Sequence, residues 1–183
     1  MNKEGMVAGA CLLVLGSSLF TRLGRADDAR DEAIPEALKP SAGQALSLSA
    51  HGEGVQIYQC LVLKDDPARF AWTLKAPEAA LQDDSGKVLG KHYVGPTWEA
   101  VDGSKVVGEP VAKVDAPDSQ SIPWLLLKAK STAGHGVFSE VTSIQRLRTR
   151  GGKAPATGCD PSQSGKEVRV PYSALYRFYT SGR

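Results

Sequence analysis

The fold class is indicated most clearly by residues 55–63, which read Val55-Gln56-Ile57-Tyr58-Gln59-Cys60-Leu61-Val62-Leu63. The side chains at positions 55, 57, 59, 61 and 63 alternate with a second set that includes Gln56, Tyr58 and Cys60. A period of two is typical of an extended strand, because successive side chains point to opposite faces of a sheet. We therefore predict a strand over these residues.

Similar short runs lie on both sides of this strand. Apolar residues alternate with serines from residue 46 to 50, and a further run from 70 to 75 is expected to end at Pro77. Residues 79–93 predict a hairpin that turns at 83–86, and a long loop is expected between 151 and 166. Other strand-like runs cover 122–130, 136–149 and 172–180, the second as one long strand or a bent pair. Gly, Pro or Asp bounds each run, which predicts a single all-β domain: an antiparallel β-sandwich or a closed barrel of roughly eight short strands.

The clearest local signal is the pair Asp102-Gly103 between the strand-like runs 97–101 and 104–107. An Asp-Gly pair in this position predicts a two-residue type I′ turn, in which both central residues have φ above zero. In that register Glu99 faces Val106 and Trp98 faces Val107. Trp98 and Glu99 then point to opposite faces of the sheet.

Residues 1–26 have the features of a signal peptide. Lys3 provides a positive start, residues 6–20 are uncharged and mostly apolar, and the small residues Gly24 and Ala26 precede a charged run. We expect cleavage after Ala26; an uncleaved anchor or a lipidated Cys11 are the alternatives. Residues 27–43 are then an extended lead-in with at most a short helical turn at 36–39, and residues 44–183 form the all-β domain.

The charge balance changes once the signal peptide is removed. The full chain has 22 Lys and Arg against 20 Asp and Glu. Cleavage after Ala26 removes three positive charges and one negative charge, which leaves 157 residues with 19 charges of each sign. With no net positive charge to attract nucleic acid, we expect no nucleic-acid partner. We expect an exported protein of the periplasm or the extracellular space, without a transmembrane span after processing.

Only Cys60 and Cys159 remain after processing. An even pair in an exported protein favours one disulfide, and two free thiols are the alternative. The disulfide would close a loop of about 100 residues and stabilise the fold by roughly 4 to 5 kcal/mol.

Several segments in order along nearly the whole mature chain resemble the exported family catalogued as domain of unknown function 3455. The resemblance implies secretion and the pairing of Cys60 with Cys159, and it implies no activity, substrate or cofactor. The segments that carry it are Gly54–Cys60, His92–Glu99, Ile122–Leu127, Val141–Arg146, Gly158–Asp160 and Arg169–Tyr172.

The strongest candidate surface lies between His92 and Asp102, where an imidazole, an indole and two carboxylates occur close together. Binding pockets combine aromatic walls with a few fixed polar groups. We therefore predict a non-enzymatic binding module. Its candidate ligand contacts are Tyr58, His92, Trp98, Glu99 and Trp124.

Two alternatives remain for this surface. In a small secreted hydrolase, His92 and Glu99 would share acid-base catalysis. In a purely structural envelope protein, Trp98 would belong to the core, Glu99 would be a solvated strand residue, and Asp102 would only form the turn.

Arg146, Arg148 and Arg150 are spaced by two, so an extended strand would place them as a positive stripe on one face. The stripe could bind an anionic partner, or it could protect a sheet edge against aggregation. The histidines at 51, 92 and 135 are isolated, and no short-spaced ligand pair occurs, so we expect no metal site. We also expect no cofactor, since the sequence contains neither a phosphate-binding glycine motif nor a G-x-S-x-G elbow.

Overall fold

The structure is a computed structural model that describes residues 33–182. The expected signal peptide, residues 1–26, lies outside the described residues, and so do residues 27–32 of the lead-in. The rest of the lead-in contains a short 3-10 helix, η1 (Glu36–Leu38), where a single helical turn was expected. Among the described residues, no helix is both long enough and apolar enough to cross a membrane.

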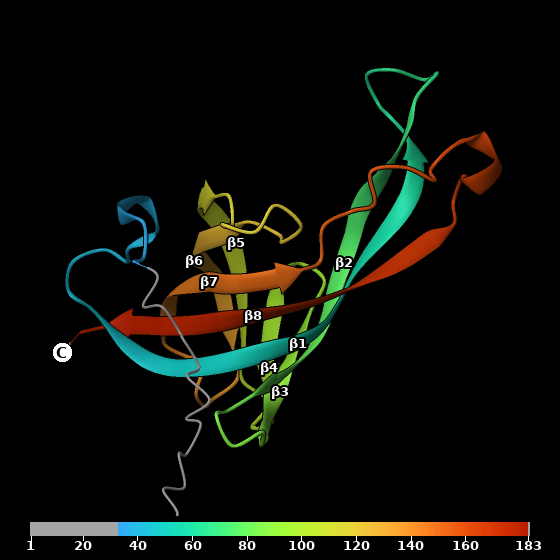
Figure 1. The fold of residues 1–183 in the computed structure, drawn as a ribbon. Coiled ribbons are helices and arrows are strands. Elements are labelled where there is room, and N and C mark those ends of the chain that lie inside the picture. The colour runs from blue at the N-terminus through green and yellow to red at the C-terminus, as the bar shows by residue number, and fades with distance from the viewer. Residues whose placement is uncertain (1–32, 183) are drawn as a thin grey trace, which may run out of the picture. The chain divides into compact units, whose positions relative to one another are not determined.

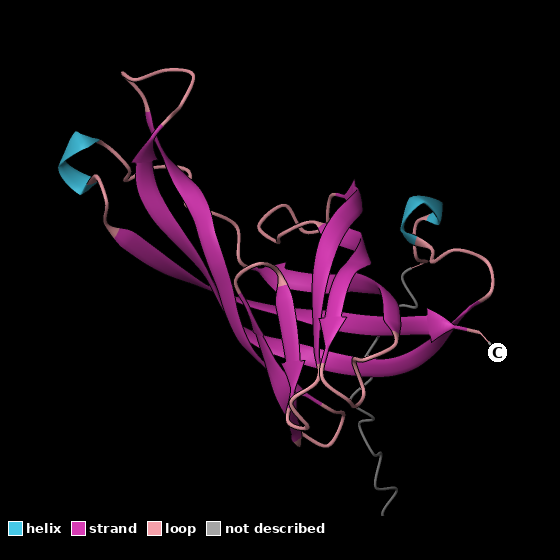
Figure 2. Ribbon diagram, turned by 180° about the vertical axis from the view of Figure 1, so that it is seen from behind, coloured by secondary structure: helices cyan, strands magenta, loops and turns pink. Residues whose placement is uncertain are grey.

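Eight antiparallel strands form one closed barrel (Figures 1 and 2). Each strand pairs with the next one along the chain, and β8 closes the barrel by pairing with β1. The all-β prediction is confirmed, and of the two expected architectures the closed barrel forms. The strands are β1 (Gln44–Val62), β2 (Phe70–Gln82), β3 (Val88–Tyr93), β4 (Thr97–Ala100), β5 (Lys105–Val114), β6 (Trp124–Ala133), β7 (Val141–Gly151) and β8 (Glu167–Ser181).

β1 is one strand of 19 residues, where the sequence pattern indicated two short ones. Gly52 and Gly54 separate the two predicted runs without forming a turn. A Cβ atom on Gly52 would lie 2.5 Å from the ring of Tyr176, and one on Gly54 would lie 2.0 Å from the carbonyl oxygen of Glu78. Glycine at these positions therefore allows β1 to pack closely against β8 and β2, and the strand continues.

β2 continues through Pro77, which was expected to end it. Pro77 pairs with Gln56 close to a register shift at which β2 has one extra residue, Lys75, and β3 pairs with β2 only from Ala79 onward. A strand tolerates proline where one of its edges is unpaired, because the missing N–H then has no partner to lose. The turn between β2 and β3 at residues 83–86 is confirmed, with Gly86 at φ 84°.

The connection between β4 and β5 differs from the predicted type I′ turn. Trp98 pairs with Val106 and Glu99 with Lys105, one residue away from the expected register. The loop has three residues, 101–103, in which Gly103 has a positive φ of 85° and Asp102 does not. Asp102 Oδ1 instead accepts hydrogen bonds from the amide (2.8 Å) and the hydroxyl (2.6 Å) of Ser104. A type I turn followed by a left-handed glycine explains the shifted register, and Trp98 and Glu99 still point to opposite faces.

Two hydrophobic cores lie on opposite sides of the sheet. The larger one lies inside the barrel and contains the fully buried rings of Trp98, Tyr176 and Phe178. The smaller one lies on the outer face, where Leu38 of η1 packs with Trp124 and Leu147. η1 therefore covers part of β5 and β6 from outside, and its Leu38 also reaches Leu147 of β7.

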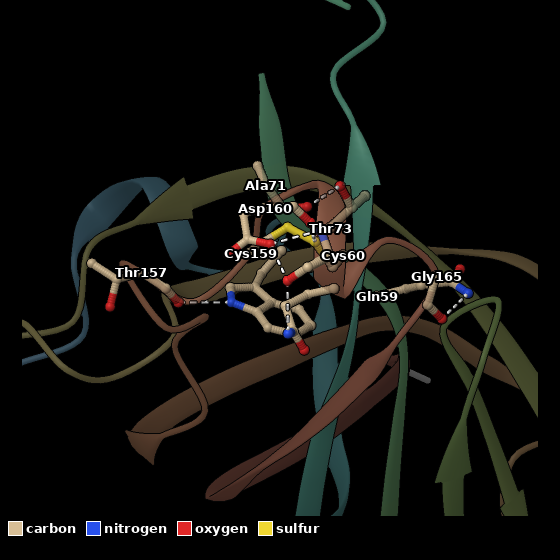
Figure 3. The surroundings of a disulfide bond; sticks show 11 residues. Gln59, Cys60, Ala71, Thr73, Thr157, Cys159, Asp160 and Gly165 are labelled. Atoms are coloured by element: carbon tan, nitrogen blue, oxygen red, sulfur yellow. Dashed lines mark hydrogen bonds between the residues drawn. A yellow bond between two sulfur atoms is a disulfide. The ribbon is translucent and has the colours of Figure 1, made fainter. Parts of the chain in front are cut away.

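The far ends of β1 and β2 and the start of β8 project from the barrel as an arm (Figure 1). The long loop between β7 and β8 lies on this arm, and the disulfide between Cys60 and Cys159 holds it there, with the two Cα atoms 5.4 Å apart (Figure 3). The amide of Gly165 also donates to the Cys60 carbonyl (2.8 Å), and Trp72 Nε1 donates to the Thr157 carbonyl (2.9 Å). The predicted disulfide is confirmed.

Candidate functional site

A cavity of about 320 Å³ leads from the barrel interior to the surface beside the β3–β4 turn. Leu74 and Val94 lie at its opening, since each is more than half exposed. Its volume falls at the lower end of the range for small-ligand sites. Most of the wall is apolar. It is formed by Leu74, Ala76, Pro77, Val94, Pro96, Pro110, Leu125 and Leu127, with polar groups from Gln56, Lys75, His92, Trp98 and Arg146.

His92 lies on β3 with its side chain in the barrel interior, 2% exposed. Its ring stacks on Trp98 with centroids 4.3 Å apart, and Nδ1 donates to the Thr97 carbonyl at 2.9 Å. Burial lowers the pKa of His92 to about 3, so the ring is neutral at physiological pH. A neutral ring that donates through Nδ1 carries a free lone pair on Nε2, which can accept a hydrogen bond from a ligand.

Trp98 of β4 is both a core residue and part of the cavity wall. It is 1% exposed and makes edge contacts with Tyr176 and Phe178. Its indole Nε1 is buried and has no hydrogen-bond partner in the structure. The core role and the ligand-contact role proposed from the sequence are therefore compatible for this residue.

Arg146 of β7 also lines the cavity. Its Nε and Nη2 both donate to the carbonyl oxygen of Pro123, at 3.1 and 2.9 Å. Burial lowers the pKa of Arg146, but a guanidinium keeps its charge in proteins. The barrel interior therefore contains a positive charge.

The arginine stripe predicted from the sequence does not form. Arg146 pairs with Tyr176, whose side chain points inward, whereas Arg150 pairs with Ser173 on the outward face of β8. A bulge between Leu147 and Arg150, with Arg148 at φ 48°, inserts an extra residue and reverses the side to which β7 presents its side chains. Arg148 and Arg150 lie in an exposed depression beside His51 and Glu53, away from Arg146.

Glu99 lies on the outer face of the barrel and does not meet His92. Its carboxylate accepts a hydrogen bond from the Tyr93 hydroxyl (2.7 Å) and forms ion pairs with Lys105 (3.2 Å) and Lys91 (3.5 Å). The hydrogen bonds from Tyr93 and Lys105 lower the pKa of Glu99. The two groups of the alternative acid-base pair therefore lie on opposite sides of one sheet.

The two remaining predicted contacts also lie outside the cavity wall. Tyr58 is buried in the barrel and its hydroxyl donates to the Gly152 carbonyl at 2.7 Å. Trp124 belongs to the outer core under η1, on the other side of β6 from Leu125 and Leu127. Of the five predicted ligand contacts, the structure brings His92 and Trp98 together in the cavity.

Gln56 is a polar residue of the cavity that was not among the predicted ligand contacts. It is 1% exposed, it lines the cavity, and its Nε2 has no hydrogen-bond partner. Its position in the alternating strand carried a signal, because Gln56 shares a face of β1 with Tyr58 and Cys60. Once those two side chains are recognised as inward-facing, Gln56 must also point inward.

The described residues, 33–182, contain no group of three or more His, Cys, Asp or Glu side chains that could hold a metal ion. His51 is hydrogen-bonded to Asp84 at 2.8 Å on the surface, and His135 is exposed in the loop before β7.

These features define the chain as a small antiparallel β-barrel domain with one disulfide and an interior cavity. A family model described as "Protein of unknown function (DUF3455)" matches residues 40–180, so the chain belongs to this family. Searches of the curated proteins and of the solved structures find no match.

Proposed function

We propose that this domain is a non-enzymatic binding module that holds one small amphipathic organic molecule in its cavity. The observation that carries the proposal is the carboxamide of Gln56. Its nitrogen is buried without a hydrogen-bond partner in the wall of a largely apolar cavity. A buried donor left unpaired costs about 1 to 3 kcal/mol, and an acceptor on a bound ligand would remove that cost.

Other polar atoms around the cavity support the same proposal. Trp98 Nε1 is a second buried donor without a partner, and His92 Nε2 is an acceptor that forms no hydrogen bond with the described residues. An apolar wall with a few fixed donors and acceptors is the usual composition of a small-ligand site.

The separation of His92 and Glu99 favours binding over hydrolysis. An acid-base pair needs both groups within hydrogen-bond reach of the same substrate atoms, directly or through one water molecule. Here the imidazole is neutral inside the barrel and the carboxylate is held by two lysines outside it.

We also propose that the protein is exported to the cell envelope or the extracellular space. The disulfide supports this location, because disulfides persist in oxidising compartments. The intact mass of the protein recovered from its native source tests the proposal. We expect a chain that begins at Asp27, and a full-length chain in the cytoplasm would contradict it.

The binding proposal is tested by screening a library of small amphipathic molecules against the ¹⁵N-labelled domain by NMR. We expect some members to shift the amide resonances of Gln56, His92 and Leu127. Ala76→Trp, which places a large ring in the cavity wall, should abolish these shifts. Ala80→Trp is the matched control, because Ala80 lies on the same strand outside this cavity. A library without any binder at these residues, or binding that Ala76→Trp leaves unchanged, would overturn the proposal.

A further inference from the structure

The interior arginine has no anionic partner among the described residues. No Asp or Glu lines the cavity, and no described carboxylate forms an ion pair with Arg146. The neighbouring phenols of Tyr58, Tyr172 and Tyr176 do not balance the charge, because burial raises the pKa of each and keeps it neutral. A partly buried charge without a counter-ion is costly, and proteins usually pair such groups.

We propose that the ligand is an organic monocarboxylate and that Arg146 and Gln56 bind its carboxylate group. This inference rests on the proposed binding function. The apolar side chains of the cavity would then surround the hydrocarbon part of the ligand.

The hydrogen-bonding capacity of the two side chains fits this group. A guanidinium has five N–H donors, and the Pro123 carbonyl takes those of Nε and one on Nη2. Both protons of Nη1 and one of Nη2 remain for a ligand, together with the two protons of the unpartnered Gln56 amide. A carboxylate presents two oxygens that accept such donors.

The charge balance selects a singly charged anion. Lys75, the other cation in the lining, pairs with Glu167 at the surface, so its charge is already compensated. His92 adds no positive charge, because its ring is neutral. One uncompensated cation matches a monocarboxylate, whereas a phosphate monoester would bring an excess negative charge into the barrel.

Matched pairs of acids and alcohols test this assignment by isothermal titration calorimetry at pH 7. The probes are butanoate, hexanoate, octanoate and 3-phenylpropionate, each compared with its primary alcohol, and phenyl phosphate as the phosphate monoester. We expect the best acid to bind at least about tenfold more tightly than its alcohol and than phenyl phosphate.

Variants test whether Arg146 and Gln56 cause the preference for acids over alcohols. Arg146→Met should reduce the acid-to-alcohol ratio to within about twofold, and Gln56→Leu should reduce it partly. Lys128→Met is the matched control and should keep the wild-type ratio, since it removes a cation that is paired with Glu109 outside this cavity. The wild-type ratio decides the question by itself if a variant fails to fold.

The outcomes separate the two proposals. Alcohols that bind as tightly as acids, or a phosphate monoester that binds most tightly, would overturn the monocarboxylate assignment and leave the binding function intact. A tenfold acid preference that Arg146→Met does not reduce would also overturn it. If no compound in the broader NMR screen binds in the cavity, the binding function itself fails.

Discussion

The barrel and the arm of this molecule are stabilised in different ways. The barrel encloses the rings of Trp98, Tyr176 and Phe178 and excludes water from them. In the arm, residues 61–75 and 153–167 include no buried residue, and the buried Cys60 lies opposite Trp72 of β2. The arm depends instead on the disulfide and on hydrogen bonds between its loop and its strands.

This difference shows how a long loop can stay ordered without a core of its own. Buried apolar area provides most of the stability of a folded domain, and the loop between β7 and β8 buries little of it. A covalent bond lowers the entropy of the unfolded chain and so replaces part of the missing burial. Variants of each region should therefore affect different parts of the molecule.

Replacing both cysteines, Cys60→Ser with Cys159→Ser, should have the largest effect. The loop between them spans 99 residues, so its closure is expected to contribute about 4 to 5 kcal/mol to the free energy of unfolding. Urea denaturation measures this loss, and hydrogen exchange should show that amides of the arm lose protection before those of the barrel. Equal loss of protection in both regions would contradict the proposed division.

Trp98→Ala should destabilise the barrel by about 4 kcal/mol, because it leaves a large void among packed rings. Urea denaturation of the variant measures this loss. Trp98→Phe, which keeps an aromatic ring, should cost less. If Trp98→Ala lowered the free energy of unfolding by less than the loss of a single buried methylene group does, the barrel interior would not depend on this ring.

Acidification should weaken the barrel through His92. Its pKa is 6.5 when unfolded and about 3 when folded, so between these values the unfolded chain binds one proton more and stability falls as the pH falls. We expect a loss of about 2 to 3 kcal/mol between pH 7 and pH 4.5 from this residue. Urea denaturation across this range should show a weaker pH dependence in His92→Gln. The exposed-residue control His135→Gln should retain the wild-type dependence, and equal slopes in all three proteins would contradict the assignment.

Trp72→Phe should have a smaller effect that is confined to the arm. It removes the hydrogen bond from the indole Nε1 to the Thr157 carbonyl, worth about 1 kcal/mol, and keeps most of the ring. Hydrogen exchange should report faster opening of the loop at residues 152–166 and unchanged protection in the barrel. Faster exchange throughout the barrel would instead show that the stabilities of the arm and the barrel are coupled.

Glu99→Gln should have the smallest effect. The ion pairs of Glu99 with Lys91 and Lys105 lie on the solvated outer face, where such pairs contribute little and are screened by salt. We expect a small decrease in the urea midpoint at low ionic strength that disappears in about 1 M NaCl. A decrease as large as that of Trp98→Ala would contradict the assignment of Glu99 to the outer face.

The strands, the turn at residues 83–86 and the disulfide could be predicted because each depends on local or compositional features. The alternation in residues 55–63 indicates a strand whatever its neighbours, and two cysteines in a chain expected to be exported favour one disulfide. The register of the β4–β5 hairpin was wrong by one residue because the Asp102 side chain bonds to Ser104 and changes the turn type. The candidate site was predicted only in part, since Trp98 and Trp124 point to different cores.

By itself the sequence therefore determined that the chain forms β-strands and which residues alternate along them, and it favoured a disulfide between Cys60 and Cys159 without excluding free thiols. The tertiary structure decided which face of each strand lies inside, because closure of the barrel and the packing of η1 set the two sides of the sheet. It also decided that Arg146 points inward while Arg150 points outward, because a bulge in β7 reverses the alternation. Gln56 and Arg146 are about 90 positions apart in the sequence and line one cavity only in the folded barrel, and periodicity along one strand does not contain that information.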